Sequence, residues 1–226
     1  MFILSFSVYA NSIVLKITTT KGTIVNREVD VSINEITFFD SDSQKYSISN
    51  ISGLGQLPNL ESITFYNISN ILDYAFLAEA SGIKKLYMAS CSVSSLMFLQ
   101  SLTNLKYLHL DLYIRNESLS NILEERVSFA LHKKIEFIKF STNGIIRVPP
   151  FFELTTKPYI DLRNNNISRL KEDEIMLLLQ YSLISLKYNP IVNNSYEKDK
   201  LKEIHIQFDD TISLPEKIIA IYHDFE

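Results

Sequence analysis

The fold is decided by the stretch Ile83-Lys-Lys-Leu86-Tyr-Met88-Ala-Ser-Cys91-Ser-Val93, in which apolar residues stand at fixed intervals around one small Cys. The same intervals return in Ile135-Glu-Phe-Ile138-Lys-Phe140-Ser-Thr-Asn143-Gly-Ile145, with Asn in place of the Cys. A pattern that recurs at a period of about 20 to 50 residues indicates a protein built by stacking one structural unit. Such a chain presents an extended surface rather than a single deep pocket, which favours binding over catalysis.

The pattern recurs along most of the chain. We place the first apolar position of each unit at Ile33, Leu60, Ile83, Leu105, Ile135, Lys157, Tyr181 and Leu201. The successive spacings are 27, 23, 22, 30, 22, 24 and 20 residues. The first and last units keep only part of the pattern, as expected of terminal units that face solvent on one side. The sequence therefore predicts about seven to eight repeats within residues 33–211.

Each residue type in the pattern has a physical reason. The apolar-x-apolar centre, such as Leu86-Tyr-Met88, predicts a short strand whose alternate side chains point into the stack. The Asn or Cys position marks the point where the chain turns inward, and a buried polar side chain there needs hydrogen-bond partners. Asn165 and Asn189 are expected to bond the backbone of the turn, and Cys91 is expected to fill the same slot as a buried structural thiol.

Three segments of the sequence resemble those of bacterial leucine-rich repeat proteins, including the internalin-like group. They are residues 48–63 with Ile-Ser-Gly-Leu-Gly-Gln-Leu-Pro-Asn-Leu, residues 161–167 with Asp-Leu-Arg-Asn-Asn-Asn-Ile, and residues 186–191 with Leu-Lys-Tyr-Asn-Pro-Ile. The resemblance implies an α/β fold: a right-handed solenoid, or horseshoe, with a parallel sheet on its concave side and short helices on its convex side. It also implies recognition of a protein partner, such as a host or envelope protein, without naming one.

Several segments depart from the regular repeat. The long unit predicts a helix over residues 116–134, and a second short helix is expected over residues 171–181. Residues 148–152, Val-Pro-Pro-Phe-Phe, are expected to be extended because Pro disfavours a helix. Residues 12–32 predict a β-hairpin that caps the amino-terminal edge of the sheet, and residues 212–226 predict a helical cap at the other end.

Composition limits the functional classes. The 226 residues are 46% hydrophobic, which suits one domain with a continuous core, and the net charge of −4 gives no basic footprint for nucleic acid. No stretch reaches the length of a transmembrane helix. Residues 1–11 are either the remnant of a signal peptide ending in Val8-Tyr-Ala10 or a first strand. The first interpretation, which the short apolar core favours, predicts an exported or envelope protein of a bacterium; the second leaves a cytoplasmic location open.

The positions between the core residues of each strand are expected to line the concave side. We predict a partner-binding patch of exposed aromatic side chains with mixed charges, formed by Tyr87, Tyr107, His109, Phe137, Lys139, Tyr159, Asp161 and Arg163. The competing interpretation is that aromatic neighbours on adjacent strands only stabilise the sheet. A second functional class, a glycan- or matrix-binding adhesive or structural envelope protein, fits the same aromatic residues.

The sequence does not favour an enzyme. It contains no H-E-x-x-H, no G-x-S-x-G and no glycine-rich phosphate loop. His109 and His205 occupy the same repeat position four units apart, so they are not expected to meet. One Cys excludes an intramolecular disulfide and a four-Cys metal site. We therefore predict no catalytic residue, no cofactor and no metal.

Overall fold

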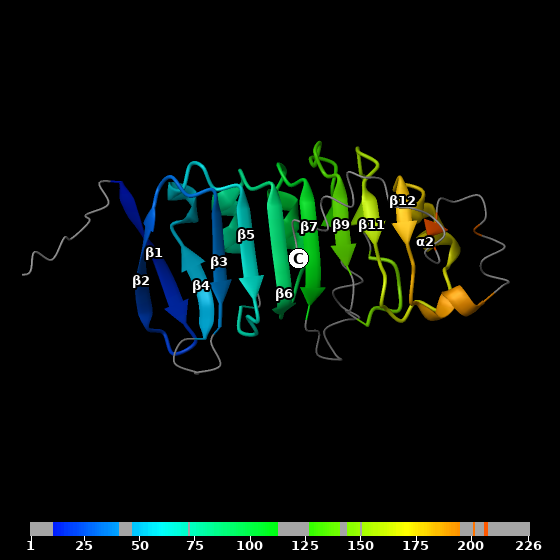
Figure 1. Ribbon diagram of the computed structural model, residues 1–226, viewed down its shortest axis with the longest axis horizontal. Helices are drawn as coiled ribbons and strands as arrows, with labels where there is room; N and C mark the ends of the chain where they lie inside the picture. Colours follow the sequence, from blue (N-terminus) through cyan, green and yellow to red (C-terminus); the bar gives the residue numbers. More distant parts are fainter. Residues whose placement is uncertain are drawn as a thin grey trace, which may run out of the picture.

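The computed structural model describes residues 11–40, 47–71, 73–112, 127–140, 144–149, 151–194, 201 and 206–207, and the structural statements below concern these residues. They form a mixed α/β structure with one long parallel sheet and few helices. Figure 1 shows the strands side by side along the longest axis, from the amino-terminal hairpin to helix α2. Residues 1–10 of the segment interpreted as a signal-peptide remnant or first strand, and the helical cap predicted at residues 212–226, lie outside the described residues.

One strand comes from each predicted unit. The eight strands are β3 (Glu35–Phe39), β5 (Ser62–Tyr66), β6 (Lys85–Cys91), β7 (Tyr107–Leu112), β9 (Phe137–Phe140), β11 (Tyr159–Asp161), β12 (Leu183–Ser185) and β13 (Ile206–Gln207). They stand in chain order in the sheet, and every neighbouring pair is parallel. The first seven begin two residues after the first apolar position assigned to their unit. The prediction of a parallel sheet with one strand per repeat is confirmed.

Alternate residues of these strands build the core. Ile63 and Phe65 of β5 and Leu86 and Met88 of β6 have no exposed surface. Because strand side chains alternate between the two faces, the residues between them point to the opposite side of the sheet, away from the core. The core is closed by return segments that contain η1 (Leu54–Gln56), η2 (Ala75–Ala80), η3 (Met97–Ser101), α2 (Glu172–Leu178) and η4 (Pro190–Asn193). Most helices of the described return segments are thus 3₁₀ helices, and the helix expected over residues 171–181 is present as α2.

The long helix expected over residues 116–134 is wrong in its described part. Val127–Ser128 is strand β8, which pairs in parallel with β10 (Phe151–Phe152) of the next return segment. Val127 and Phe129, two positions apart, are both fully buried, whereas Leu131, about one helical turn after Val127, is 67% exposed, so burial does not follow a helix face. Pairing with Phe151 overrides the helical spacing of the apolar residues. Residues 113–126 lie outside the described residues, and the extended state expected at residues 148–152 is confirmed at β10.

The Asn slot links each repeat to the preceding one. Asn189 Nδ2 donates to the carbonyl oxygens of Leu162 at 2.8 Å and Leu186 at 3.1 Å, while its Oδ1 accepts from the Ile167 amide at 3.0 Å. Asn165 does the same one repeat earlier, with Phe140 and Ile145 among its partners. The predicted role of the Asn position is confirmed at both residues.

A left-handed backbone precedes this slot in four repeats. Asn67, Ser90, Asn164 and Tyr188 have φ values of 56°, 53°, 56° and 58°. Each stands directly before the slot residue, which is Ile68, Cys91, Asn165 or Asn189. This conformation is costly for a bulky side chain such as Tyr188, so the turn is imposed by the repeat rather than by local preference.

The amino-terminal hairpin consists of β1 (Ser12–Thr19) and β2 (Ile24–Asp30), paired antiparallel. Its partner differs from the prediction, because β1 pairs with strand β4 (Ile48–Ser52) of a return segment and not with the edge strand β3. The side chain of Arg27 contacts that edge: its Nη1 donates to the Thr37 carbonyl oxygen at 3.0 Å, and its guanidinium lies 5.5 Å from the Phe38 ring centre. The hairpin therefore extends the layer of return segments.

Candidate binding surface

The strand register brings the predicted site residues together. Tyr107, Phe137 and Tyr159 occupy one row across β7, β9 and β11, and Lys85 continues this row on β6. A second row on the same face contains Tyr87, His109, Lys139 and Asp161. Arg163 follows β11 and binds Asp161, with 2.8 Å between Nε and Oδ2. The eight residues are therefore neighbours, as the repeat pattern predicted.

The prediction that this cluster is exposed is wrong for half of it. Phe137 and Asp161 have no exposed surface, while Tyr159 is 2% and His109 is 4% exposed. The Phe137 and Tyr159 rings lie 5.5 Å apart, and the His109 ring contacts Tyr87 edge-on at 4.4 Å. At β9 and β11 the side chains that point away from the core are thus also shielded from solvent. These aromatic rings therefore contribute to packing. Tyr87, Tyr107, Lys139 and Arg163 remain half-buried.

Burial also determines the charge of His109. Loss of solvation, together with the positive charges of Lys139 and Arg163, lowers the pKa of His109 to about 3. The imidazole is therefore neutral near pH 7 and does not add to the positive charge of the surface. This residue belongs to the covered part of the sheet.

The face of the sheet that points away from the core is exposed over the amino-terminal strands. Phe39 at the end of β3 is 62% exposed, and Tyr66, its register partner at the end of β5, is 55% exposed. Tyr87 lies on the next strand, where burial, the Asp111 carboxylate and the neighbouring Tyr66 raise its pKa. Phe39 was not among the predicted site residues, although the consecutive Phe38-Phe39 pair signals that one of two adjacent strand aromatics must face outward. Phe39, Tyr66 and Tyr87 thus lie on three neighbouring strands, although Tyr87 is the register partner of Thr64 and not of Tyr66.

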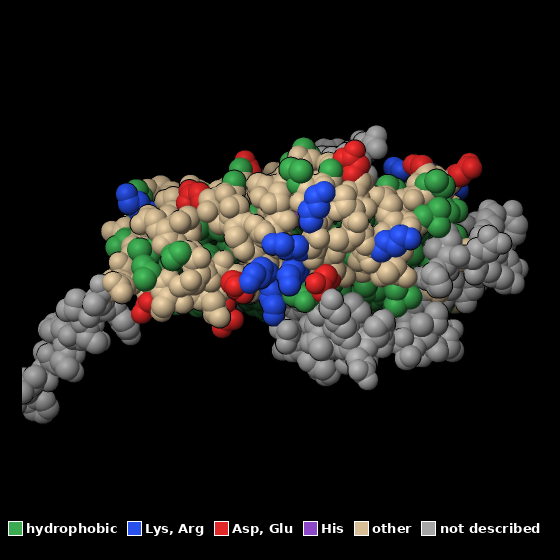
Figure 2. Space-filling model, turned by 90° about the horizontal axis from the view of Figure 1, so that it is seen from above, with side chains coloured by type: hydrophobic (Ala, Val, Ile, Leu, Met, Phe, Trp, Pro, Cys, Tyr) green, Lys and Arg blue, Asp and Glu red, His purple; other side chains and the backbone are tan. Residues whose placement is uncertain are grey.

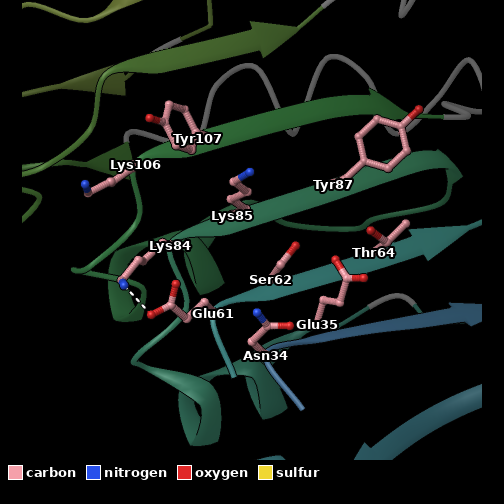
Figure 3. A pocket seen from close by; sticks show the side chains of 10 residues that line it. All are labelled: Asn34, Glu35, Glu61, Ser62, Thr64, Lys84, Lys85, Tyr87, Lys106 and Tyr107. Carbon is pink, nitrogen blue, oxygen red and sulfur yellow. Dashed lines mark hydrogen bonds and ion pairs between the residues drawn. The ribbon is translucent and has the colours of Figure 1, made fainter. Parts of the chain in front are cut away.

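A hollow of about 580 Å³, which Tyr87 also lines, lies at the beginnings of β3, β5, β6 and β7. Figure 3 shows Lys84, Lys85 and Lys106 on its β6–β7 side, and Glu35 and Glu61 on its β3–β5 side. Lys84 forms an ion pair with Glu61. Seen along the strands from where they begin, Figure 2 shows Lys and Arg side chains gathered at one place, with Asp and Glu at its margins. This hollow was not predicted from the sequence. Lys84 and Lys106 each directly follow the first apolar position of their repeat, which is the one sequence signal of it.

The backbone fixes the positions of these charges. The amide of Lys84 donates to the Glu61 carbonyl oxygen at 2.7 Å, and the amide of Lys106 donates to the Lys84 carbonyl oxygen at 2.8 Å. Lys85 Nζ lies 5.7 Å from the Tyr107 ring centre, within the range of a cation–π contact. The Tyr107 hydroxyl donates to Glu136 Oε2 at 3.4 Å. Hydrogen bonds between neighbouring repeats therefore hold the backbone of Lys84 and Lys106 in place.

Cys91 has the structural character predicted for it. Its side chain has no exposed surface, and Sγ lies 3.3 Å from the Ala89 carbonyl oxygen and 3.5 Å from that of Phe65. Burial raises the pKa of this thiol to about 11, so it is protonated near neutral pH and a poor nucleophile. Among the described residues, no group of three or more His, Cys, Asp and Glu side chains is placed to hold a metal ion.

The chain-ordered parallel sheet and the recurrent Asn slot define a leucine-rich repeat fold. A comparison with protein-family models found no match, and neither did a comparison with curated proteins. Among solved structures, the chain is similar to an internalin (InlF) from Listeria monocytogenes, with 18% sequence identity and a TM-score of 0.41. The similarity covers 76% of this chain and 54% of the internalin, so the chain spans about half the length of that protein. Likeness at this level says nothing about what this chain binds.

None of the helices in the described residues is both long enough and apolar enough to cross a bilayer.

Proposed function

We propose that this chain is a protein-recognition module that binds its partner over the amino-terminal half of the concave sheet, from β3 to β7. The observation that carries the proposal is the exposure of Phe39 and Tyr66, 62% and 55%, on neighbouring strands of a sheet in which Phe137 and Tyr159 are buried. Large aromatic side chains that remain in water next to charged groups are the usual composition of binding hot spots. The hollow with Lys85 and Tyr107 extends this surface to the beginnings of the strands.

The proposed site lies two strands closer to the amino-terminal end of the sheet than the site predicted from sequence. The proposed site keeps Tyr87 and Tyr107 of the predicted residues and adds Phe39 and Tyr66. Phe137, Tyr159 and Asp161 leave it because they have almost no surface to offer a partner. Lys139 and Arg163 border the covered part of the sheet and are not required for binding.

Affinity capture with matched variants tests the proposal. The test variant is Phe39→Ser with Tyr66→Ser, and the control is Met176→Ser with Leu179→Ser, two residues that are 62% and 48% exposed at α2. Loss of the captured protein with the test variant alone supports binding over β3–β7. Equal capture by wild type and both variants would refute it. A sugar array probed with the same proteins separates protein recognition from glycan binding, for which aromatic rings are also suited.

The wider architecture and location are part of the same proposal. We take the sheet and its return segments to be a right-handed, horseshoe-like solenoid of seven to eight repeats over residues 33–211, with the hairpin of residues 12–32 in front. Export to the bacterial envelope rests on the apolar segment at residues 1–10. Mass spectrometry of the natively produced protein tests it: a mature chain beginning at Asn11 supports export, and a chain that retains residues 1–10 opposes it.

A further inference from the structure

Charged side chains follow one another where the central strands of the sheet begin. The second position of four successive repeats is occupied by Glu61, Lys84, Lys106 and Glu136. The amide of Lys84 donates to the Glu61 carbonyl oxygen at 2.7 Å, and the amide of Lys106 donates to that of Lys84 at 2.8 Å. The amide of Glu136 donates to the Lys106 carbonyl oxygen at 2.9 Å. Two lysines therefore stand side by side between two glutamates, and Figure 2 shows Lys and Arg side chains gathered at this end of the strands.

A third lysine approaches this pair from the next repeat. Lys134 Nζ donates to Asn104 Oδ1 at 2.9 Å, and Asn104 Nδ2 donates to the Ser81 carbonyl oxygen at 3.1 Å. Asn104 stands two residues before Lys106, so this bond holds the Lys134 ammonium group beside the repeat that contains Lys106. We call Lys84, Lys106 and Lys134 the lysine cluster.

Two of the three charges in the lysine cluster are not offset by a carboxylate within the described residues. Lys84 forms an ion pair with Glu61, so its charge is compensated. Neither Lys106 nor Lys134 forms an ion pair within the part of the chain that the structure describes. The amide of Asn104 is neutral and leaves the charge of Lys134 intact. Lys106 is half-buried and Lys134 is exposed, and like charges on adjacent repeats repel one another, so the fold gains little from this arrangement.

We infer that the lysine cluster receives a short acidic segment of the protein partner, whose carboxylates pair with Lys106 and Lys134. The row of second positions limits the length of that segment, because Glu61 lies on one side of the lysines and Glu136 on the other. A long, uniformly negative polymer that crosses the strands would meet repulsion at both margins and from the net charge of −4. One or two carboxylates fit between the margins. This inference rests on the proposed function and adds the charge of the partner segment at the beginnings of β6 and β7.

Fluorescence anisotropy at low ionic strength tests it with labelled peptides as probes. A Ser-based peptide with two Glu residues separated by one position is compared with the same peptide carrying Gln instead. Wild type is expected to bind the Glu peptide about fivefold more tightly, a preference that weakens with salt. Lys106→Gln with Lys134→Gln should abolish the preference. Lys16→Gln with Lys21→Gln, the same loss of charge at exposed positions of the amino-terminal hairpin, should keep it.

A charge reversal gives a result that loss of structure would not produce. Lys106→Glu with Lys134→Glu makes the centre of the row acidic, so this variant should prefer a peptide that carries Arg at the two positions. In affinity capture at low ionic strength, Lys106→Gln with Lys134→Gln should retain less of the partner than Lys16→Gln with Lys21→Gln.

Three results would overturn the inference: equal affinity of wild type for the Glu and Gln peptides, the same behaviour of the two Gln variants, or no reversal in the Glu variant. A sulfated hexasaccharide that binds wild type more tightly than the Glu peptide, and loses affinity in Lys106→Gln with Lys134→Gln, would assign the lysine cluster to an acidic glycan instead. If Phe39→Ser with Tyr66→Ser loses the partner while the Lys106 and Lys134 variant retains it, the proposed function stands and the acidic segment fails. If both retain the partner, the proposed function fails as well.

Discussion

Phe39 and Tyr66 lie opposite one another on the parallel strands β3 and β5, and both rings are more than half exposed. Exposed aromatic side chains of this size are hydrophobic surface that folding leaves in contact with water. Farther along the same sheet, Phe137 and Tyr159 form a comparable neighbouring pair with almost no exposure. The two pairs share the repeat but differ in role, because only the first offers surface to a partner.

The exposed pair is expected to matter for binding and little for stability. Phe39→Ser with Tyr66→Ser should change the free energy of unfolding by no more than about 1 kcal/mol, because exposed substitutions remove few packed contacts. Urea unfolding followed by circular dichroism measures this. A loss of several kcal/mol would show that the two rings hold β3 in the sheet and are not a free surface.

The covered pair should behave in the opposite way. Phe137→Ala removes a fully buried ring that packs on Tyr159, and a cost of about 3–5 kcal/mol is expected from the lost contacts and the cavity. Tyr107→Ala, one strand away and half-buried, serves as the comparison and should cost clearly less. Similar unfolding midpoints for the two variants would contradict the division of the concave side into an open and a covered part.

These two pairs also show how far the sequence predicts the structure. The repeat period correctly assigns Ile63 and Phe65 to the core, places Asn165 and Asn189 in the turn slot, and puts Tyr107, Phe137 and Tyr159 in one row. The period specifies the face on which a side chain lies. It does not specify whether that face is covered, so the burial of Phe137 and the exposure of Phe39 could not be predicted from it.

The hairpin and the long unit illustrate a second limit. Alternation within residues 12–31 predicts two strands, but the choice of β4 as the partner of β1 depends on the distant segment Ile48–Ser52. The strand at Val127 is set in the same way by pairing with Phe151. Local periodicity carries little information about such distant partners. The hollow was not predicted because the charged residues that line it belong to four different repeats. No single repeat contains enough of them to indicate a cluster.

The Asn slot should be a major source of stability. Asn189→Ala leaves the carbonyl oxygens of Leu162 and Leu186 and the amide of Ile167 without this partner in a buried turn. Unsatisfied buried groups cost about 1–3 kcal/mol each, and with partial relaxation a total loss of about 3 kcal/mol is expected. Exposed Asn166→Ala is the control and should stay within about 0.5 kcal/mol of wild type in urea unfolding. Equal effects would show that the side-chain bonds of Asn189 add little.

His109 predicts a loss of stability in acid. Its pKa is about 3 in the folded chain and near 6.5 when unfolded, so the unfolded state binds the proton more readily. Stability should therefore fall as the pH drops below about 6.5, by up to about 1.4 kcal/mol per pH unit from this residue. Comparing urea unfolding of wild type and His109→Gln between pH 7 and pH 4.5 isolates the contribution. Parallel pH profiles would mean that His109 is not held neutral by burial.

Site-specific photo-crosslinking tests most directly that the partner binds over β3–β7. A benzophenone side chain is placed at Tyr66 on the open concave side and, in a separate protein, at Leu179 beside α2, two positions that are 55% and 48% exposed. We predict that the partner retained in affinity capture is crosslinked from position 66, and that excess unlabelled wild-type chain competes for it. Crosslinking from position 179 with none from position 66 would contradict a binding surface on the amino-terminal half of the sheet.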